Sequence, residues 1–290
     1  MQFARDKAKS REAFQDLTWM AQEQLLNMAD LDVVLVETSP RDCLRAAQAA
    51  IDAGKHIHLD KPAGESLEQF ERILKLAEQK QLIVQMGYMY RYNPAIKLLR
   101  ELVQKGWLGE IFEVHAVMSK VLAPSERQDL AIYPGGMMFE LGCHLIDLVV
   151  DLLGEPKAIS SHAQHASKQS DSLKDNMLAV FDYERAIATI KSSAQEVDGF
   201  VRRHLVVCGT EGTCHVQPLD NPSIRLTQRA RGDYRAGQQE IELPKYARYV
   251  EDAAEMAKVL RHETESRFGP QHDLAVQRCA RLADCCSWIW

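Results

Sequence analysis

The hydrophobic pattern of the first ninety residues alternates between short apolar runs and amphipathic stretches. Residues 33–36, 56–59 and 82–86 form the short runs, whereas 43–53 and 66–80 repeat apolar residues at helical spacing. A short run without regular polar alternation is typical of a strand buried on both faces of a parallel sheet. Strand, helix, strand, helix, strand therefore predicts a doubly wound α/β domain.

The rest of the chain has a different pattern. A helix-like stretch covers 1–30, before the first strand, and helical periodicity also marks 92–105 and 137–153. Strand-like runs separated by turns follow, which favours a mainly antiparallel sheet; they lie at 158–162, 177–182, 186–191 and 204–208. The last helices are expected at 246–262 and 272–285.

These patterns predict two domains. Residues 1–92 would form a Rossmann-type α/β domain, and 93–290 an α+β domain for substrate binding and oligomer formation, with its C-terminal helices able to pack back on the first. Ligands of doubly wound sheets bind beyond the carboxyl ends of the strands. The loops at 37–40, 60–62 and 85–88 are therefore expected to surround one crevice.

Composition narrows the class of protein. With 46% hydrophobic residues and a net charge of -6, the chain lacks the basic field of a nucleic-acid-binding protein. It has no run of about 18 apolar residues, as a membrane span requires, and no apolar signal core at its start. Its seven cysteines have no CxxC spacing, which favours reduced thiols over disulfides or a zinc ribbon. We therefore expect a cytoplasmic protein without nucleic-acid or membrane partners.

Three segments place chemically useful residues in a recognisable order. Residues 53–62 read AGKHIHLDKP, 87–94 read GYMYRYNP, and 134–147 read PGGMMFELGCHLID. Together they resemble the signature segments of the Gfo/Idh/MocA family, which includes glucose-fructose oxidoreductase and inositol dehydrogenase. The resemblance covers roughly residues 30–155 and implies an NAD(P)-dependent oxidoreductase acting on a sugar or polyol, usually as a homo-oligomer.

Hydride transfer explains why such residues should meet. The reaction needs a group that exchanges the hydroxyl proton and a positive group that stabilises charge on the oxygen. Lys61, at the end of a predicted strand, suits the second role, and the resemblance places it beside both the nicotinamide and the reacting carbon. The resemblance also makes His144 the general acid/base, with Glu140 four residues earlier on the same predicted helix face.

Glu140 departs from the family pattern, which usually has aspartate there. The longer side chain leaves open whether Glu140 holds substrate or orients His144. An incidental histidine on a solvated helix face is the alternative for His144. A metal site of Glu140, His144 and Asp147 is also conceivable, but the spacing of a catalytic zinc site is missing, so we expect no metal.

The resemblance also implies residues that bind cofactor and substrate. NAD or NADP is expected to contact the strand-end residues Thr38, Ser39, Pro40, Asp60, Lys61, Pro62 and Gln85. The sugar or polyol is expected to contact Arg91, Tyr92, Asn93, Glu140 and His144.

The family's first domain opens with a strand and a G-x-G-x-x-G turn that binds pyrophosphate at a helix N-terminus. Gly54 is the first glycine of this chain, so no such turn precedes residues 33–36. We therefore expect a truncated first domain with weakened cofactor binding. Two alternatives to a dehydrogenase stay open: a degenerate relative that binds a sugar or another protein, and an NAD-recycling glycoside hydrolase.

Overall fold

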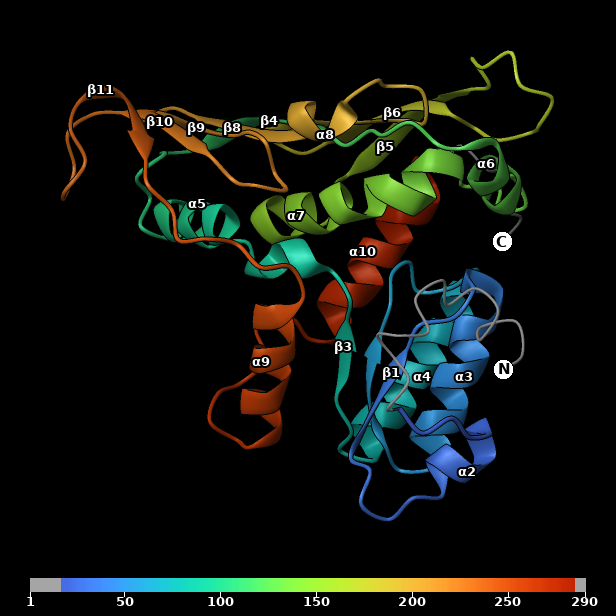
Figure 1. The fold of residues 1–290 in the computed structure, drawn as a ribbon. Helices are drawn as coiled ribbons and strands as arrows, with labels where there is room; N and C mark the ends of the chain where they lie inside the picture. Colours follow the sequence, from blue (N-terminus) through green and yellow to red (C-terminus); the bar gives the residue numbers. More distant parts are fainter. Residues whose placement is uncertain (1–16, 285–290) are drawn as a thin grey trace.

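The computed structural model describes residues 17–284 and contains two sheets, one small and parallel, the other large (Figure 1). Of the helix-like stretch predicted at 1–30, the described part forms only the short helix α2 (Gln22–Leu26), and residues 1–16 lie outside the described range. The remaining elements of the first domain follow the predicted order of strands and helices.

The small sheet has the order β1-β2-β3, and both of its strand pairs are parallel. Its strands are β1 (Val33–Val36), β2 (His56–Leu59) and β3 (Val84–Met86). Helices α3 (Pro40–Asp52) and α4 (Leu67–Gln79) bury their apolar sides with this sheet in one core. Ile57 and Leu59 on the central strand are fully buried, whereas Leu35 on the edge strand β1 is 65% exposed.

The large sheet has eight strands in the order β11-β10-β9-β8-β4-β7-β6-β5. Its strands are β4 (Ile111–Val117), β5 (Ala158–Gln164), β6 (Asn176–Asp182), β7 (Ile187–Ser193), β8 (His204–Gly209), β9 (Gly212–Val216), β10 (Ile224–Gln228) and β11 (Gly237–Ile241). Neighbouring strands are antiparallel except for β4 and β7. The predicted combination of a Rossmann-type parallel sheet and a mainly antiparallel sheet is therefore confirmed.

Helices cover one face of the large sheet, while its other face is largely open (Figure 1). The covering helices are α5 (Pro94–Gln104), α7 (Cys143–Leu153) and α10 (Pro270–Ala283). Helix α10 contacts α7, β5 and also α4 of the first domain. Gln277 of α10 donates a hydrogen bond of 3.0 Å to the carbonyl of Gly64, so this C-terminal helix joins the two parts of the molecule.

Several elements differ from the sequence-based predictions. Strands β9 to β11 and helices α6 (Pro124–Ala131) and α8 (Gly199–Arg202) were not anticipated. The helix expected from residue 246 begins only with α9 (Val250–Leu260). Tyr249, just before α9, has a φ of 67°, and this left-handed backbone prevents the helix from continuing backwards.

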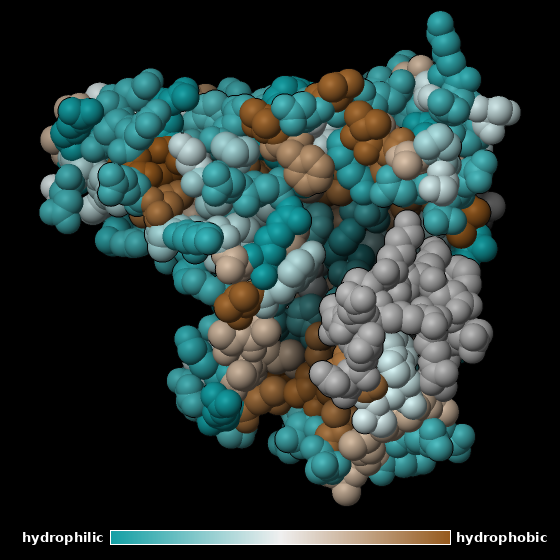
Figure 2. Space-filling model, in the orientation of Figure 1, coloured by the Kyte–Doolittle hydropathy of each residue, from teal (hydrophilic) through white to brown (hydrophobic). Residues whose placement is uncertain are grey.

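The junction of the two sheets is formed by short helical turns. The 3-10 helix η2 (Met89–Tyr92) leads from β3 into α5, and the π-helical turn η3 (Met138–Gly142) leads into α7. The face drawn in Figure 2 is hollowed between the layer of the large sheet and the small sheet below it. Within the described residues, no helix combines the length and the apolar character that a membrane crossing demands.

Candidate active site

Lys61 connects the two parts of the molecule at this junction. It lies two residues after the end of β2, and its side chain is 15% exposed. Its Nζ donates a hydrogen bond of 2.9 Å to the backbone carbonyl of Glu140 in η3 and lies 3.4 Å from Oε2 of the same residue. The lysine of the first domain and the carboxylate of the second, predicted separately from two motifs, are therefore in contact.

The charge of Lys61 is set by two opposing effects. Burial lowers its pKa, but the nearby acidic groups, Glu140 foremost among them, outweigh burial and raise the pKa above the ordinary value. The opposite balance holds for Asp60, where burial raises the pKa in spite of the positive charge of Lys61. Lys61 is thus a charged ammonium near neutral pH, able to stabilise negative charge on a substrate oxygen.

His144 lies at the start of α7 and is buried, with 5% of its surface exposed. The rings of Tyr88 and Tyr90 meet its imidazole edge to face, at centroid distances of 5.9 and 5.2 Å. Its Nδ1 is buried without a hydrogen-bond partner among the described residues. Burial, followed by the positive charge of Lys61, lowers the pKa of His144 well below its ordinary value. The imidazole is therefore neutral at neutral pH and able to accept a proton.

The backbone between Glu140 and His144 is not a regular α-helix. Residues Met138–Gly142 form a π-helical turn and His144 begins the α-helix α7, so the single regular α-helix that was predicted through Glu140 and His144 is interrupted here. Gly136, just before this turn, has a φ of 50°, and a Cβ there would lie 2.5 Å from the carbonyl oxygen of Lys174, so this position requires glycine. Such π-helical turns occur frequently at functional sites.

The low pKa of His144 makes stability depend on pH in a defined direction. Below about pH 6.5 the unfolded chain binds a proton at this histidine while the folded chain does not. The free energy of unfolding therefore decreases as the pH is lowered. For each pH unit of acidification, we expect the free energy of unfolding of His144→Phe to decrease by up to about 1.4 kcal/mol less than that of the unmodified protein. Urea unfolding of both proteins at several pH values from neutral to mildly acidic measures it, and parallel pH profiles would contradict the assignment.

Arg91, a predicted substrate-binding residue, is engaged in a buried ion-pair network. It is 1% exposed and donates from Nε and Nη2 to Asp147, at 2.6 to 3.1 Å, and from Nη2 to Asp273 at 2.6 Å. Nε2 of His272 lies 3.0 Å from the Asp147 carboxylate. These contacts tie η2 to α7 and α10. They leave Arg91 almost no exposed surface for a substrate, so we assign it a structural role.

Asn93 also has a structural position. Its side chain is fully buried, its Oδ1 accepts from the backbone N–H of Ala95 at 2.9 Å, and its Nδ2 donates to the carbonyl of Leu219 at 2.8 Å. The first bond caps the N-terminus of α5, where free N–H groups need an acceptor. Asn93 therefore fixes the start of α5 and joins it to the segment at Leu219.

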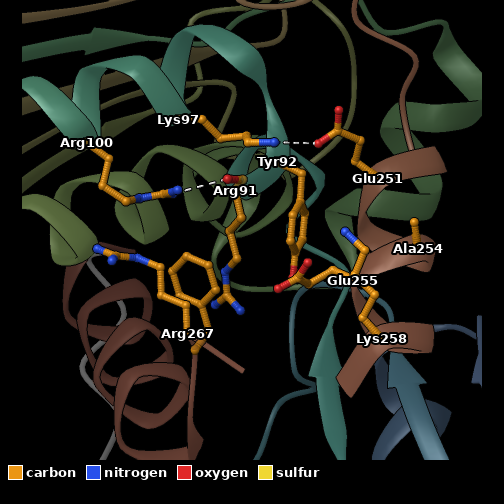
Figure 3. A pocket seen from close by; sticks show the side chains of 10 residues that line it. Arg91, Tyr92, Lys97, Arg100, Glu251, Ala254, Glu255, Lys258 and Arg267 are labelled. Atoms are coloured by element: carbon orange, nitrogen blue, oxygen red, sulfur yellow. Dashed lines mark hydrogen bonds and ion pairs between the residues drawn. The ribbon is translucent and has the colours of Figure 1, made fainter. Parts of the chain in front are cut away.

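Tyr92 lines a pocket of about 380 Å³ between α5, η2 and α9 (Figure 3). Its lining residues are Arg91, Tyr92, Lys97, Arg100, Glu251, Ala254, Glu255, Lys258, Arg267 and Phe268. Most of the cations there already have a carboxylate partner: Lys97 lies 2.7 Å from Glu251, and Arg100 and Arg267 both contact Asp151. Because Lys61, Glu140 and His144 are not part of this lining, we place the chemistry outside this pocket.

The predicted cofactor-binding residues lie at the carboxyl ends of adjacent parallel strands, with one exception. Thr38 and Ser39 are exposed after β1, and Pro40 is the first residue of α3. Asp60, Lys61 and Pro62 follow β2, the neighbouring strand. Gln85 is the exception, because it lies within β3, is 8% exposed and donates to the carbonyl of Asp252 at 2.9 Å. The exposed hydroxyls and the ammonium fit a nicotinamide riboside along this edge.

Several polar side chains near His144 were missed by the sequence reasoning. Tyr90 lies inside the motif at residues 87–94, but no role was assigned to it. The sequence around Arg203 and Arg248 contains no motif that would indicate a functional residue. Arg203 precedes β8, and Arg248 lies between β11 and α9. Only the tertiary fold brings these arginines to the same place as η2, through Asp220 and the hydroxyl of Tyr90.

Comparison with known proteins identifies the family. Residues 2–88 match the model of the oxidoreductase family with an NAD-binding Rossmann fold (GFO_IDH_MocA), and residues 96–215 match the model of the GFO/IDH/MocA C-terminal domain. The chain is 26% identical over 211 residues to an uncharacterized oxidoreductase of Schizosaccharomyces pombe, which covers 71% of this chain and 56% of that protein.

Two further relatives agree with this match. An inositol 2-dehydrogenase of Salmonella paratyphi B is 25% identical over 213 residues, covering 72% of this chain and 61% of the relative. The structure of an NAD binding oxidoreductase from Klebsiella pneumoniae superposes with a TM-score of 0.78 at 17% identity, covering 92% of this chain and 80% of that one, and so shares the fold. The matched region spans somewhat more than half the length of the two curated relatives. The two family models together match most of the chain, in the predicted order, and the chain belongs to the Gfo/Idh/MocA family of oxidoreductases.

Proposed function

We propose that this protein transfers a hydride between NAD or NADP and a hydroxyl-bearing carbon of a sugar or polyol. The observation that carries the proposal is that the ammonium of Lys61 contacts Glu140 in η3 and is close enough to His144, at the start of α7, to act on its charge. The charge of Lys61 helps to lower the pKa of His144, and its Nζ contacts Glu140 four residues before that histidine. A charged ammonium and a neutral imidazole at one place suit alcohol oxidation and carbonyl reduction.

The two side chains would divide the reaction between them. In the oxidation direction, His144 accepts the hydroxyl proton, because its low pKa keeps the imidazole neutral. Lys61 donates a hydrogen bond to the same oxygen and stabilises the negative charge that develops on it. Glu140 keeps the ammonium charged and in place through its carbonyl and carboxylate oxygens. A bound nicotinamide supplies the hydride acceptor.

The substrate class is inferred from the relatives. The inositol 2-dehydrogenase named above is similar over 72% of this chain, which supports a polyol as substrate. The presence of both Lys61 and His144, with the charge of Lys61 acting on the imidazole, favours an enzyme over a sugar-binding or protein-interaction relative. We also propose a cytoplasmic location, because the five cysteines among the described residues are all free.

We further propose that the protein forms homo-oligomers through the open face of the large sheet. Ile187, on β7, points away from the buried side occupied by Ala188 and Ile190, and it is 53% exposed. An apolar residue at that position gains stability when a second sheet covers it. The net charge of -6 gives no reason to expect a nucleic acid as the partner instead.

Replacing Lys61 by methionine tests the proposal. We expect kcat/KM to fall about 100- to 1,000-fold, because the variant keeps the length of the side chain but cannot stabilise charge on the substrate oxygen. The rate is measured from nicotinamide absorbance with a panel of sugars and polyols and with both cofactors. Lys75→Met is the control, since Lys75 is 66% exposed on α4 and forms an ion pair with Glu71. Equal rates for Lys61→Met and Lys75→Met would refute the assigned role.

A further inference from the structure

A cluster of charged side chains lies beside the catalytic histidine. It consists of Arg203, Asp220, Arg248 and Tyr90, called here the arginine cluster. Nη1 of Arg203 lies 3.0 Å from Oδ2 of Asp220, and Nη2 of Arg248 contacts the other oxygen of the same carboxylate. The hydroxyl of Tyr90 donates to Asp220 at 2.7 Å and lies 3.3 Å from Nη2 of Arg248. One carboxylate thus holds two guanidinium groups.

The cluster is connected to His144 through Tyr90. The ring of Tyr90 packs edge to face against the imidazole at 5.2 Å, while its hydroxyl belongs to the cluster. After burial and Lys61, the charges of Arg203 and Arg248 add to the lowering of the pKa of His144. A molecule whose hydroxyl carbon lies at Lys61 and His144 would therefore have the cluster about one tyrosine side chain away.

The cluster carries a surplus positive charge. Two arginines face one aspartate, and within residues 17–284 neither arginine is paired with a second carboxylate. Arg203 is 4% exposed and fixed, because its Nε donates to the carbonyl of Ser119 and its guanidinium lies 3.8 Å from the ring centroid of Phe200. A partly buried surplus charge of this kind is costly unless an anion compensates it.

Arg248 is the member of the arginine cluster that has hydrogen-bond donors available for a ligand. Its side chain is 35% exposed, and its Nε and Nη1 make no hydrogen bond to the residues that the structure describes. Arg248 lies on the segment that runs from β11 past η2 to α9 (Figure 1), and Tyr246 anchors this segment by donating to the carbonyl of Met89 at 3.0 Å. The guanidinium is therefore held at the junction with part of its fork unoccupied.

We propose that the arginine cluster binds an anionic group of the substrate, so that the protein acts on a sugar acid or a sugar phosphate rather than on a neutral polyol. This inference rests on the proposed function, because it places the anion relative to the hydroxyl carbon at Lys61 and His144. Arg248 contributes its positive charge and the free N–H donors of Nε and Nη1, which carboxylate and phosphate oxygens accept. Arg203, already fixed by its contacts, positions Asp220 and adds charge.

Calorimetric titration of the full chain with matched probes tests the proposal. Gluconate and glucitol have the same carbon chain and differ at one end, which is a carboxylate in gluconate and a hydroxymethyl group in glucitol. Inorganic phosphate is a probe that offers an anion without a carbon chain. We expect gluconate or phosphate to bind at least about tenfold more tightly than glucitol. Arg248→Gln should abolish that preference, whereas Arg248→Lys should keep part of it, because the positive charge remains but the separate N–H donors of the guanidinium are lost.

The control is Arg229→Gln. Arg229 follows β10, its side chain is 78% exposed, and it forms an ion pair with Glu211. This variant should keep the preference for the anion. Equal binding of anions and glucitol by the unmodified protein, no binding of either anion, or a preference that survives in Arg248→Gln would each overturn the proposal. If anion binding depends on Arg248 but no sugar reduces the nicotinamide, the hydride-transfer proposal fails and the anion site stands.

Discussion

Replacement of His144 by phenylalanine is expected to lower kcat by roughly 100- to 10,000-fold, the range contributed by a positioned general acid or base. Phenylalanine keeps an aromatic ring between Tyr88 and Tyr90 but cannot accept a proton. Because the loss concerns the chemical step, KM for the sugar or polyol should change much less than kcat. Steady-state rates in both reaction directions, followed by nicotinamide absorbance, measure the effect.

The control for this variant is His162→Phe, because His162 is an exposed residue of β5, and its rate should equal that of the unmodified protein. A second expectation follows because the imidazole of His144 is already neutral before it accepts the substrate proton. The rate of alcohol oxidation should stay level as pH is lowered to about 6.5, since the folded imidazole does not yet take up a proton. A rate in His144→Phe within a few fold of the control would remove this residue from the mechanism.

Replacement of Arg91 by methionine is expected to destabilise the fold by about 3–5 kcal/mol, because it leaves buried carboxylates without their cation. Asp147 and Asp273 are 1% and 2% exposed, so solvent cannot replace the lost partner. Urea unfolding followed by circular dichroism measures the loss. The effect is structural, so it should appear without any substrate or cofactor.

A second substitution separates lost packing from unpaired charge. In Arg91→Met with Asp147→Asn, one of the stranded carboxylates is neutral, so the destabilisation should be smaller than in Arg91→Met alone. Lowering the pH should also reduce the deficit of the single variant, because without Arg91 the pKa of the buried carboxylates rises and protonation favours the folded state. A single variant as stable as Arg229→Met would show that this network contributes nothing.

The parts of the fold that could be predicted are those encoded locally. The runs at 33–36, 56–59 and 82–86 became β1 to β3 because parallel strands covered by helices need continuous apolar sequence. Strand β10, by contrast, alternates buried and exposed residues within five positions and lies between turns, and no such short run was recognised. The start of α9 was placed too early because the left-handed backbone of Tyr249 has no signature in the sequence.

Only part of the candidate site could be predicted from the sequence. Lys61 and Glu140 were each named from a motif at the end of a predicted element, but the contact that the structure shows between them was not predicted. Arg91 has the same chemistry as a substrate-binding arginine, and only the burial of Asp147 and Asp273 against it reveals a structural role. The arginine cluster could not be predicted, because Arg203 and Arg248 meet through strand order in the large sheet and through the segment leading to α9.

The most direct test of the account is transfer of deuterium from substrate to nicotinamide. The protein would be incubated with oxidised NAD or NADP and with polyols and sugar acids that carry deuterium on their hydroxyl-bearing carbons, and the nicotinamide analysed by mass spectrometry. The account predicts deuterated reduced nicotinamide with the unmodified protein and with Lys75→Met, and its loss in both Lys61→Met and His144→Phe. Deuterium transfer that persists in the Lys61 and His144 variants would contradict it, as would no transfer from any substrate when nicotinamide binding is demonstrated.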